Sequence, residues 1–200
     1  MPRTLRKPSP LTPAKLEEMA LAYVARFATT RAKLEAYLAR KLRERGWEGD
    51  RAPDVEGLSR RFAEAGYVDD AAFARMKSES LLRRGYGGRR VGEALRAAGV
   101  EEDVRTEVAP DAAQASRAAL MLAKRRRFGP WCDPLPDRPQ REKQIAAMLR
   151  AGHTLDNARR IVEATEMATV EAWFDSALGF DSALGFDSEA APSMGDDICE

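Results

Sequence analysis

The fold of this chain is decided by residues 66–100, GYVDDAAFARMKSESLLRRGYGGRRVGEALRAAGV. Asp69 stands directly before an apolar stripe, where the N-cap residue of a helix accepts free backbone N–H groups. Residues 86–88 interrupt the stripe, and a second stripe then runs to Gly99. The pattern predicts a helical hairpin with helices near 69–85 and 88–98. Four arginines flank its corner: Arg83, Arg84, Arg89 and Arg90.

The rest of the chain has the same helical character. Apolar residues recur at helical spacing on both sides of the hairpin, and no stretch alternates with a period of two. Asp111, with Gln114 three residues later, resembles a capping box. We therefore expect an all-α protein without a sheet, whose further helices lie near 13–28, 30–46, 53–66, 100–108, 111–127, 139–151 and 154–162.

The helices group in threes with a measurable period. The phrases LRERGW, LRAAGV and LRAGHT each close a middle helix, and their glycines Gly46, Gly99 and Gly152 are 53 residues apart. Two equal spacings with matching neighbours indicate a tandem repeat. Each three-helix unit is too small to bury much surface alone, so neighbouring units should pack into an elongated, curved body. The predicted divisions are a flexible basic arm (1–12), three repeats (13–67, 68–110 and 111–166) and an acidic, disordered tail (167–200).

Charge is unevenly placed along the chain. The whole sequence has 33 Lys and Arg against 32 Asp and Glu, but residues 168–200 contain eight acids and no base. The first 167 residues therefore carry 24 acids and a net charge of +9. A basic body favours a nucleic acid or an acidic protein as partner, with the tail as an internal competitor.

Catalysis, metal binding and membrane insertion find little support in the sequence. Cys132 and Cys199 lack metal-ligand spacing, and the single histidine, His153, is expected at a helix cap or on the surface. The corner at 85–88 follows a helix rather than a strand, so it is interpreted as a tight turn and not as a phosphate loop. The longest apolar run, residues 19–25, is far shorter than the ~18 residues of a membrane helix. We expect a cytoplasmic, monomeric protein with no enzymatic activity, no cofactor and no membrane contact.

Clustered cations are the candidate binding residues, because guanidinium groups bind carboxylates and phosphates bidentately. Alternatively, arginines at helix ends cap carbonyls and complement the helix dipole. The run 124–127 lies beside Phe128 and Trp131 and ranks first, ahead of the corner arginines. The candidates are Arg83, Arg84, Arg89, Arg90, Lys124, Arg125, Arg126, Arg127, Arg138, Arg141, Lys143, Arg150, Arg159 and Arg160.

The aromatic residues have two interpretations. Phe27, Phe62, Tyr67 and Phe73, together with Met76, follow apolar stripes and are expected in the core. Trp47 and Trp131 fall outside the helices, where they either stack on bases or cover the small cores. Covering is favoured, because short helical bundles need bulky lids.

Three segments resemble the RecX family of recombination regulators: GYVDDAAFA at 66–74, RRGYGGRRVGEALRAAGV at 83–100 and QREKQIAAMLRAGHTLDNARRIV at 140–162. The resemblance covers roughly residues 14–165 and includes the plan of three repeats. It implies an all-helical protein that binds the RecA recombinase filament, lies in its groove and curbs its recombinase and co-protease activities. It also implies weak DNA binding, either direct or through the filament.

Two other function classes stay open. One is a DNA-binding helical protein or transcriptional regulator, and the other is a scaffold for a different acidic partner. The tail repeats the unit FDSALG from Phe174, Phe180 and Phe186. It is a disordered expansion, a screen that folds back on the basic body, or a short peptide resembling the F-x-x-A segments that plug recombinase protomer interfaces.

Overall fold

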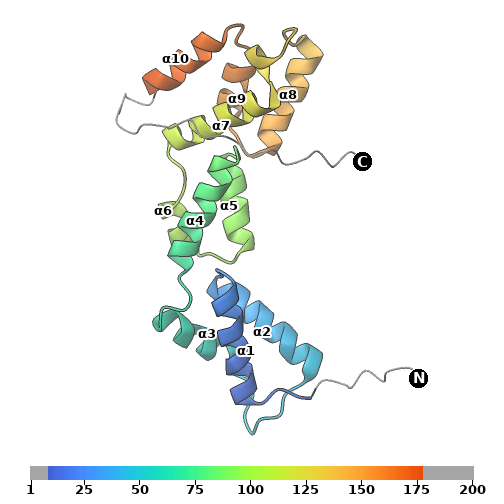
Figure 1. Ribbon diagram of the computed structural model, residues 1–200, viewed down its shortest axis with the longest axis vertical. Helices are drawn as coiled ribbons and strands as arrows, with labels where there is room; N and C mark the ends of the chain where they lie inside the picture. Colours follow the sequence, from blue (N-terminus) through green and yellow to red (C-terminus); the bar gives the residue numbers. More distant parts are fainter. Residues whose placement is uncertain (1–8, 178–200) are drawn as a thin grey trace, which may run out of the picture.

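The protein is an elongated stack of helices, seen in a computed structural model that describes residues 9–177 (Figure 1). Within this range there are ten α-helices, one short 3₁₀ turn and no strand. The all-α architecture of three-helix repeats is thereby confirmed. We call α1–α3 repeat 1, α4–α6 repeat 2 and α7–α9 repeat 3. The helices are α1 (Pro13–Arg26), α2 (Arg31–Arg45), α3 (Val55–Glu64), α4 (Asp70–Arg83), α5 (Gly88–Ala97), α6 (Glu102–Glu107), α7 (Ala112–Arg126), α8 (Arg138–Arg150), α9 (Leu155–Val162) and α10 (Met167–Ala177), with the turn η1 (Gly129–Trp131) between α7 and α8.

Most helices begin at a side chain that caps them. The Asp69 carboxylate accepts a hydrogen bond of 2.8 Å from the Ala72 amide, as the sequence predicted. The capping box of Asp111 and Gln114 is also present, and Asp137 with Gln140 forms a second one at the start of α8. Because N-cap side chains lie within three residues of the amides they bind, the sequence alone predicts where these helices begin.

Each repeat has its own apolar core. Leu34, Leu38 and Phe62 lie in the core of repeat 1, and Phe73 and Leu95 lie in that of repeat 2. The core of repeat 3 is built around Leu122, Met148 and Ile161. Trp47 and Trp131 pack half-buried against the first and third of these cores, which matches their interpretation as covers.

Repeats 2 and 3 meet through their backbones. The amide of Gly87, in the corner between α4 and α5, donates to the Ala151 carbonyl at the end of α8, with 2.9 Å between N and O. The Arg89 amide likewise donates to the Gly152 carbonyl at 3.2 Å. Gly152 has a φ of +94°, which only glycine adopts without strain, and a Cβ at Gly87 would lie 2.6 Å from the amide nitrogen of His153. The two backbone segments approach this closely because neither glycine has a side chain.

Repeats 1 and 2 are joined in an equivalent way. The buried hydroxyl of Thr30, in the corner between α1 and α2, donates to the Ala98 carbonyl at the end of α5, at 2.5 Å. The Arg31 amide donates to the Asp70 carboxylate at 2.8 Å. A Cβ on Gly99 would collide with the side chain of Ala32. In both junctions, the loop between the first two helices of one repeat packs against the glycine that ends the second helix of the next repeat.

The glycine end of repeat 1 is covered by the N-terminal segment. The Leu11 amide donates to the Gly46 carbonyl at 3.0 Å, and the Glu48 amide donates to the Leu11 carbonyl at 2.9 Å. The Leu11 side chain is completely buried in the core of repeat 1. The prediction of a flexible arm over residues 1–12 is therefore wrong at Leu11, because this residue fills the place that a preceding repeat would occupy.

The predicted tail is also wrong over its first eleven residues. Met167–Ala177 form α10, and Val170 and Phe174 are buried in the core of repeat 3. The first FDSALG unit therefore starts inside the folded part of the chain, since the Phe174 ring packs in the core of repeat 3. The units starting at Phe180 and Phe186 lie outside the described residues.

Four further placements differ from the sequence expectation. Phe27 and Tyr67 are 52% and 58% exposed, because they lie just beyond the ends of α1 and α3 and pack on the outer faces of Tyr23 and Phe62. Met76 is exposed because the buried face of α4 passes through Phe73, Ala74, Ser78 and Leu81. His153 is buried rather than superficial.

The environment of His153 explains why its ring stays neutral. Its Nε2 lies 3.0 Å from the Gly85 carbonyl across the junction of repeats 2 and 3, so the neutral ring donates this hydrogen bond. Burial lowers the pKa of His153 below its ordinary value, and the hydrogen bond to Gly85 opposes this effect only in part. Nδ1 is buried without a hydrogen-bond partner within the described residues. Protonation would therefore place an uncompensated charge in the junction.

The first prediction concerns the close approach of the two repeats. Gly87→Ala should lower the free energy of unfolding by about 1–3 kcal/mol, because the new methyl group collides with the backbone at Gly152 and His153. Gly92→Ala, inside α5 and with no atom within 4 Å of the new Cβ, should be neutral or stabilising by up to ~1 kcal/mol. Urea unfolding measures both, and equal effects of the two substitutions would contradict the junction.

The second prediction concerns pH. Unfolded His153 takes up its proton near pH ~6.5, while the folded ring resists it, so stability is fully present above that pH and falls as the pH drops toward 5. His153→Gln should remove this part of the pH dependence. Because the chain has one histidine, its ring signals in NMR are assigned at once, and a folded-state pKa at or above the ordinary value would refute the account.

Candidate partner-binding surface

The junction of repeats 2 and 3 brings together cations that are far apart in the sequence. Arg83 and Arg84 end α4, while Arg89 and Arg90 begin α5. Arg125, near the end of α7, and Arg150, at the end of α8, approach the same corner from repeat 3. All six side chains are exposed, and the acid that pairs with members of this group is Glu93. We call these six arginines the junction cluster.

Two members of the junction cluster hold the repeats together. The Arg125 guanidinium donates to the Arg84 carbonyl at 2.8 Å, and the Arg89 guanidinium donates to the Leu149 carbonyl at 2.5 Å. Both bonds go to carbonyls at helix ends, and the Leu149 carbonyl also accepts from the Gly152 amide at 3.0 Å. Arg89 also pairs with Glu93 at 3.2 Å. Arg89 and Arg125 therefore cap helix ends, as one interpretation of the sequence held, and remain exposed enough to contact a partner.

The other members are less engaged. Arg90 pairs with Glu93 at 3.2 Å, and Arg84 lies 5.4 Å from the ring centroid of Tyr86. The side chains of Arg83 and Arg150 make no hydrogen bond or ion pair within residues 9–177. These two arginines are therefore the best placed to meet a partner without disturbing the junction.

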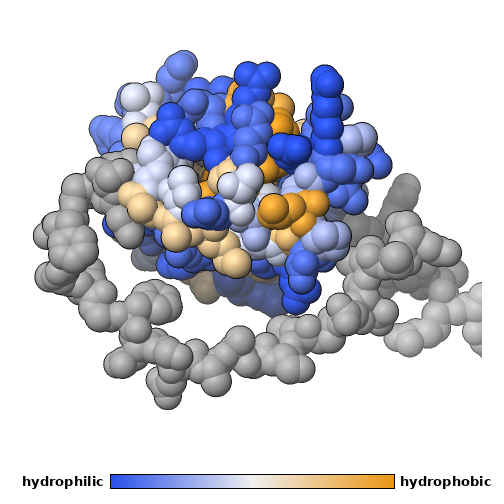
Figure 2. Space-filling model, turned by 90° about the horizontal axis from the view of Figure 1, so that it is seen from above, coloured by the Kyte–Doolittle hydropathy of each residue, from blue (hydrophilic) through white to orange (hydrophobic). Residues whose placement is uncertain are grey.

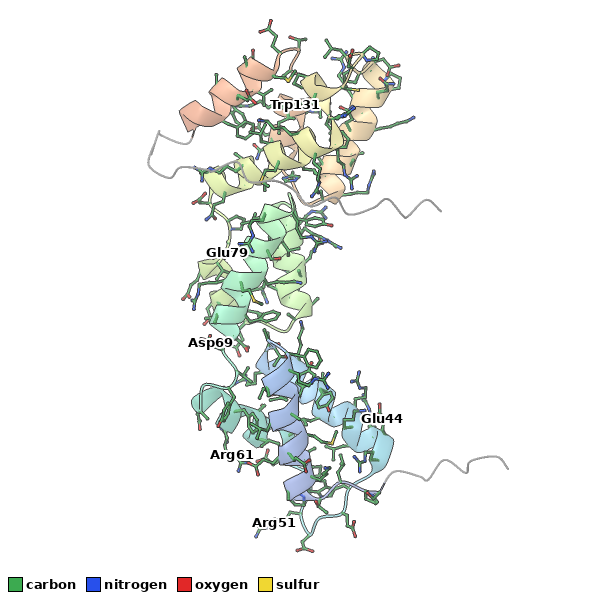
Figure 3. The ribbon with its side chains drawn as sticks, viewed as in Figure 1. Glu44, Arg51, Arg61, Asp69, Glu79 and Trp131 are labelled. Atoms are coloured by element: carbon green, nitrogen blue, oxygen red, sulfur yellow. The ribbon has the colours of Figure 1, made fainter. Side chains whose placement is uncertain are left out.

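The run 124–127 is split by the structure. The Lys124 ammonium forms an ion pair of 2.6 Å with Glu171 of α10 and lies 5.9 Å from the ring centroid of Trp131. Arg125 belongs to the junction cluster, while Arg126 and Arg127 remain exposed at the end of α7. Trp131, labelled in Figure 3, thus lies beside Lys124 as the sequence suggested, but an acid of the predicted tail occupies part of this surface.

The remaining candidates lie elsewhere on repeat 3. Arg138 pairs with Glu142, and Arg138 and Arg150 are separated by about 18 Å along α8, at 1.5 Å per residue. Arg141 is half-buried beside Pro136 and Val162. Arg160 lies 4.1 Å from the ring centroid of Trp173 on α10. Lys143 and Arg159 are exposed. The fourteen candidates therefore do not form one patch, although the face of repeat 3 seen in Figure 2 is largely hydrophilic.

Repeat 1 carries a basic surface that the sequence interpretation missed. Helix α2 has six cations against Glu35 and Glu44. On the α1–α2 face, the rings of Tyr23 and Tyr37 stack with centroids 4.2 Å apart, and the Phe27 ring lies 5.3 Å from that of Tyr23. Arg26 and Arg40 lie 5.7 Å from the rings of Phe27 and Tyr37. The composition of residues 31–45 shows the excess of cations, but the ring contacts with α1 follow only from the fold. We call this surface the aromatic–arginine face.

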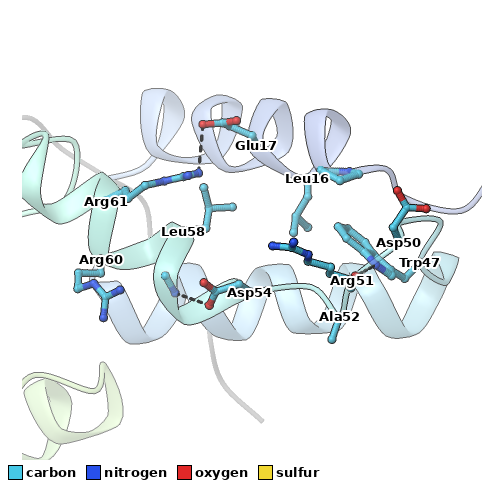
Figure 4. A pocket seen from close by; sticks show the side chains of 12 residues that line it. Leu16, Glu17, Trp47, Asp50, Arg51, Ala52, Asp54, Leu58, Arg60 and Arg61 are labelled. Carbon is cyan, nitrogen blue, oxygen red and sulfur yellow. Dashed lines mark hydrogen bonds and ion pairs between the residues drawn. The ribbon is translucent and has the colours of Figure 1, made fainter.

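A cavity in repeat 1 lies away from both cationic surfaces. It measures about 550 Å³ and opens between α1, α3 and the loop that joins α2 to α3 (Figure 4). Leu16 and Leu58 line it, together with the Arg61–Glu17 pair at 3.4 Å. Its three arginines are matched by three acids, so its charge does not select an anionic partner. Within residues 9–177 no group of His, Cys, Asp and Glu could hold a metal ion, and no helix is long and apolar enough to span a bilayer.

Comparison with known proteins places the chain in a family. The description "RecX, second three-helix domain" matches residues 69–108, which contain α4, α5 and α6. The regulatory protein RecX of Halorhodospira halophila is 32% identical over 151 residues, which cover 76% of this chain and 88% of that protein. The regulatory protein RecX of Myxococcus xanthus is 29% identical over 168 residues, covering 80% and 90%.

A solved structure shows the same fold. RecX from Lactobacillus salivarius superposes with a TM-score of 0.60 at 15% identity, covering 76% of this chain and 95% of that one. The sequence relatives are named regulatory proteins. At this identity and coverage the relationship is established, and the chain belongs to the RecX family of regulatory proteins.

Proposed function

We propose that this protein binds RecA recombinase filaments on DNA as a monomer and inhibits their recombinase, ATPase and co-protease activities. The observation that carries the proposal is family membership over about four fifths of the chain. The elongated body and the junction cluster add physical support. A filament groove exposes acidic protein surface and a bound polyphosphate strand, and guanidinium groups bind both chemistries bidentately.

The junction cluster is the contact surface that we propose, ahead of the run 124–127. Its six arginines come from α4, α5, α7 and α8, so they are exposed on one rigid part of the body where two repeats meet. Lys124 is already paired with Glu171, which weakens the case for the run 124–127 as a separate site. Rigid presentation lowers the entropy cost of binding, because Arg89 and Arg125 are held by hydrogen bonds before the partner arrives.

Direct DNA binding is a second candidate, favoured by the aromatic–arginine face of repeat 1. Aromatic rings stack on unpaired bases, and neighbouring arginines neutralise phosphates. Phe27 is 52% exposed and thus accessible to a base. The two candidates are compatible, since the face and the junction cluster lie on different repeats.

The third prediction tests recombinase inhibition. The purified chain should inhibit DNA-dependent ATP hydrolysis by RecA at substoichiometric amounts and low salt. The double variant Arg83→Glu with Arg150→Glu should raise the half-inhibitory concentration about tenfold or more, which corresponds to ~1.4 kcal/mol. Both side chains are exposed, so circular dichroism and the unfolding midpoint should not change.

The matched control is Arg51→Glu with Arg96→Glu, which changes the net charge equally at two exposed arginines outside the junction. This control should leave inhibition close to that of the unaltered chain. No inhibition at equimolar protein would refute the function, while equal losses in the two double variants would refute the site.

The fourth prediction tests the second candidate. Without RecA, the chain should bind single-stranded DNA with an affinity that falls steeply as log salt rises. Phe27→Ala should weaken this binding by about 1–3 kcal/mol if a base stacks there. Fluorescence anisotropy measures the salt dependence and the effect of the substitution. Absence of binding at low salt would contradict direct DNA binding and leave RecA binding as the remaining candidate function.

A further inference from the structure

An apolar groove lies between α4 of repeat 2 and α7 of repeat 3. It has a volume of about 270 Å³, and Leu82, Ala118 and Met121 line it. Met121 is 48% exposed and adjoins Leu82, so the two side chains offer an apolar surface to an occupant. The arginines Arg83 and Arg117 also line the groove, together with Glu79, which is labelled on α4 in Figure 3.

The charged side chains that line the groove favour an occupant with a negative charge. Neither Arg83 nor Arg117 has an ion pair or a side-chain hydrogen bond within the described range 9–177. A suitable occupant therefore offers an apolar side chain to Leu82 and Met121 and a neighbouring carboxylate to one or both arginines.

Helix α10 leads the chain toward this groove. Glu171 pairs with Lys124, near the end of α7, and Phe174 packs in the same cluster as Ala119. From Glu171 onward α10 runs back along α7, and it ends at Ala177 beside the start of α7 (Figure 1). The groove lies along that first half of α7, from Gln114 to Met121.

The residues that follow α10 have the required chemistry. The six-residue unit whose first phenylalanine, Phe174, is buried in repeat 3 begins again at Phe180 and Phe186. Each of these phenylalanines is followed by an aspartate, Asp181 or Asp187. Residues 178–200 contain six acids and no lysine or arginine. The nine residues from Ala177 to Phe186 can span up to about 30 Å, which exceeds the ~22 Å length of α7, whereas the three residues to Phe180 span about 10 Å.

We propose that the segment 178–187 docks in the α4–α7 groove of its own chain. Phe180 or Phe186 packs on Leu82 and Met121, and the following aspartate binds Arg83 or Arg117. An intramolecular occupant is favoured over a second copy, because a short connection gives it an effective concentration in the millimolar range. Docking covers Arg83, a member of the junction cluster, so the segment competes with any acidic partner that binds there. The docking itself does not depend on the proposed function.

The test uses the full chain with one thiol placed in the segment. Cys132→Ser and Cys199→Ser remove the two natural thiols, and Ser182→Cys carries a nitroxide spin label. In ¹⁵N-labelled protein, the amide signals of Leu82, Ala118 and Met121 should lose most of their intensity. The signals of Leu34 and Leu38, in the core of repeat 1, should keep theirs. A second label at Ser188→Cys should give the same pattern and guards against disturbance by the first label.

Two sets of variants separate the contacts. Arg83→Glu with Arg117→Glu should restore the groove signals, and so should Phe180→Ala with Phe186→Ala. Arg51→Glu with Arg96→Glu, which changes the net charge equally outside the groove, should leave the broadening in place. Broadening spread over all cationic surfaces, or none at all, would overturn the proposal.

A mixed sample identifies the occupant. Spin-labelled protein without ¹⁵N is mixed with ¹⁵N-labelled protein without a spin label. The groove signals should stay sharp, because each segment occupies its own chain. Broadening in the mixture equal to that in the singly prepared sample would show that a second copy provides the segment, and would overturn intramolecular docking. Because RecA is absent, failure here leaves the proposed function untouched.

Discussion

The close backbone approach at Gly87 and Gly152 is the constraint on which the arrangement of repeats 2 and 3 depends. It allows a helix corner to donate amide hydrogen bonds to carbonyls at the end of a helix in the next repeat. Thr30 and Gly99 join repeats 1 and 2 by the same plan, with a hydroxyl in place of an amide. A body held in this way needs no single large core, since each small repeat satisfies the helix end of its neighbour.

The contact between repeats 2 and 3 also determines which arginines are free to contact a partner. The corner that seats on repeat 3 is flanked by arginines, and two members of the junction cluster donate to carbonyls across the contact. The proposed contact surface therefore includes side chains that also hold the two repeats together. Arg83 and Arg150 are exposed beside this junction and take no part in it, so substituting them would test the proposed surface without breaking contacts between the repeats.

Much of the fold was predictable because its signals are local. N-caps, helix-ending glycines and apolar stripes lie within a few residues of each other, and the 53-residue spacing shows the repeat. Contacts over long sequence distances were not predictable. Leu11 lies in an arm rich in proline and charge, Phe174 lies in a low-complexity segment, and His153 becomes buried only when Gly85 packs against it. All members of the junction cluster were among the predicted residues, but their positions in the sequence do not show that they meet. The cations of α2 were not among the predicted residues, because they are interspersed with apolar and acidic residues and do not form one run.

The most direct measurement of the central claim is amide hydrogen exchange of the full chain, alone and bound to RecA filaments on single-stranded DNA. We predict added protection at the end of α4, the start of α5 and the end of α8, where the junction cluster lies. Protection confined to α1 and α2, or no change at any segment of repeats 2 and 3, would contradict it.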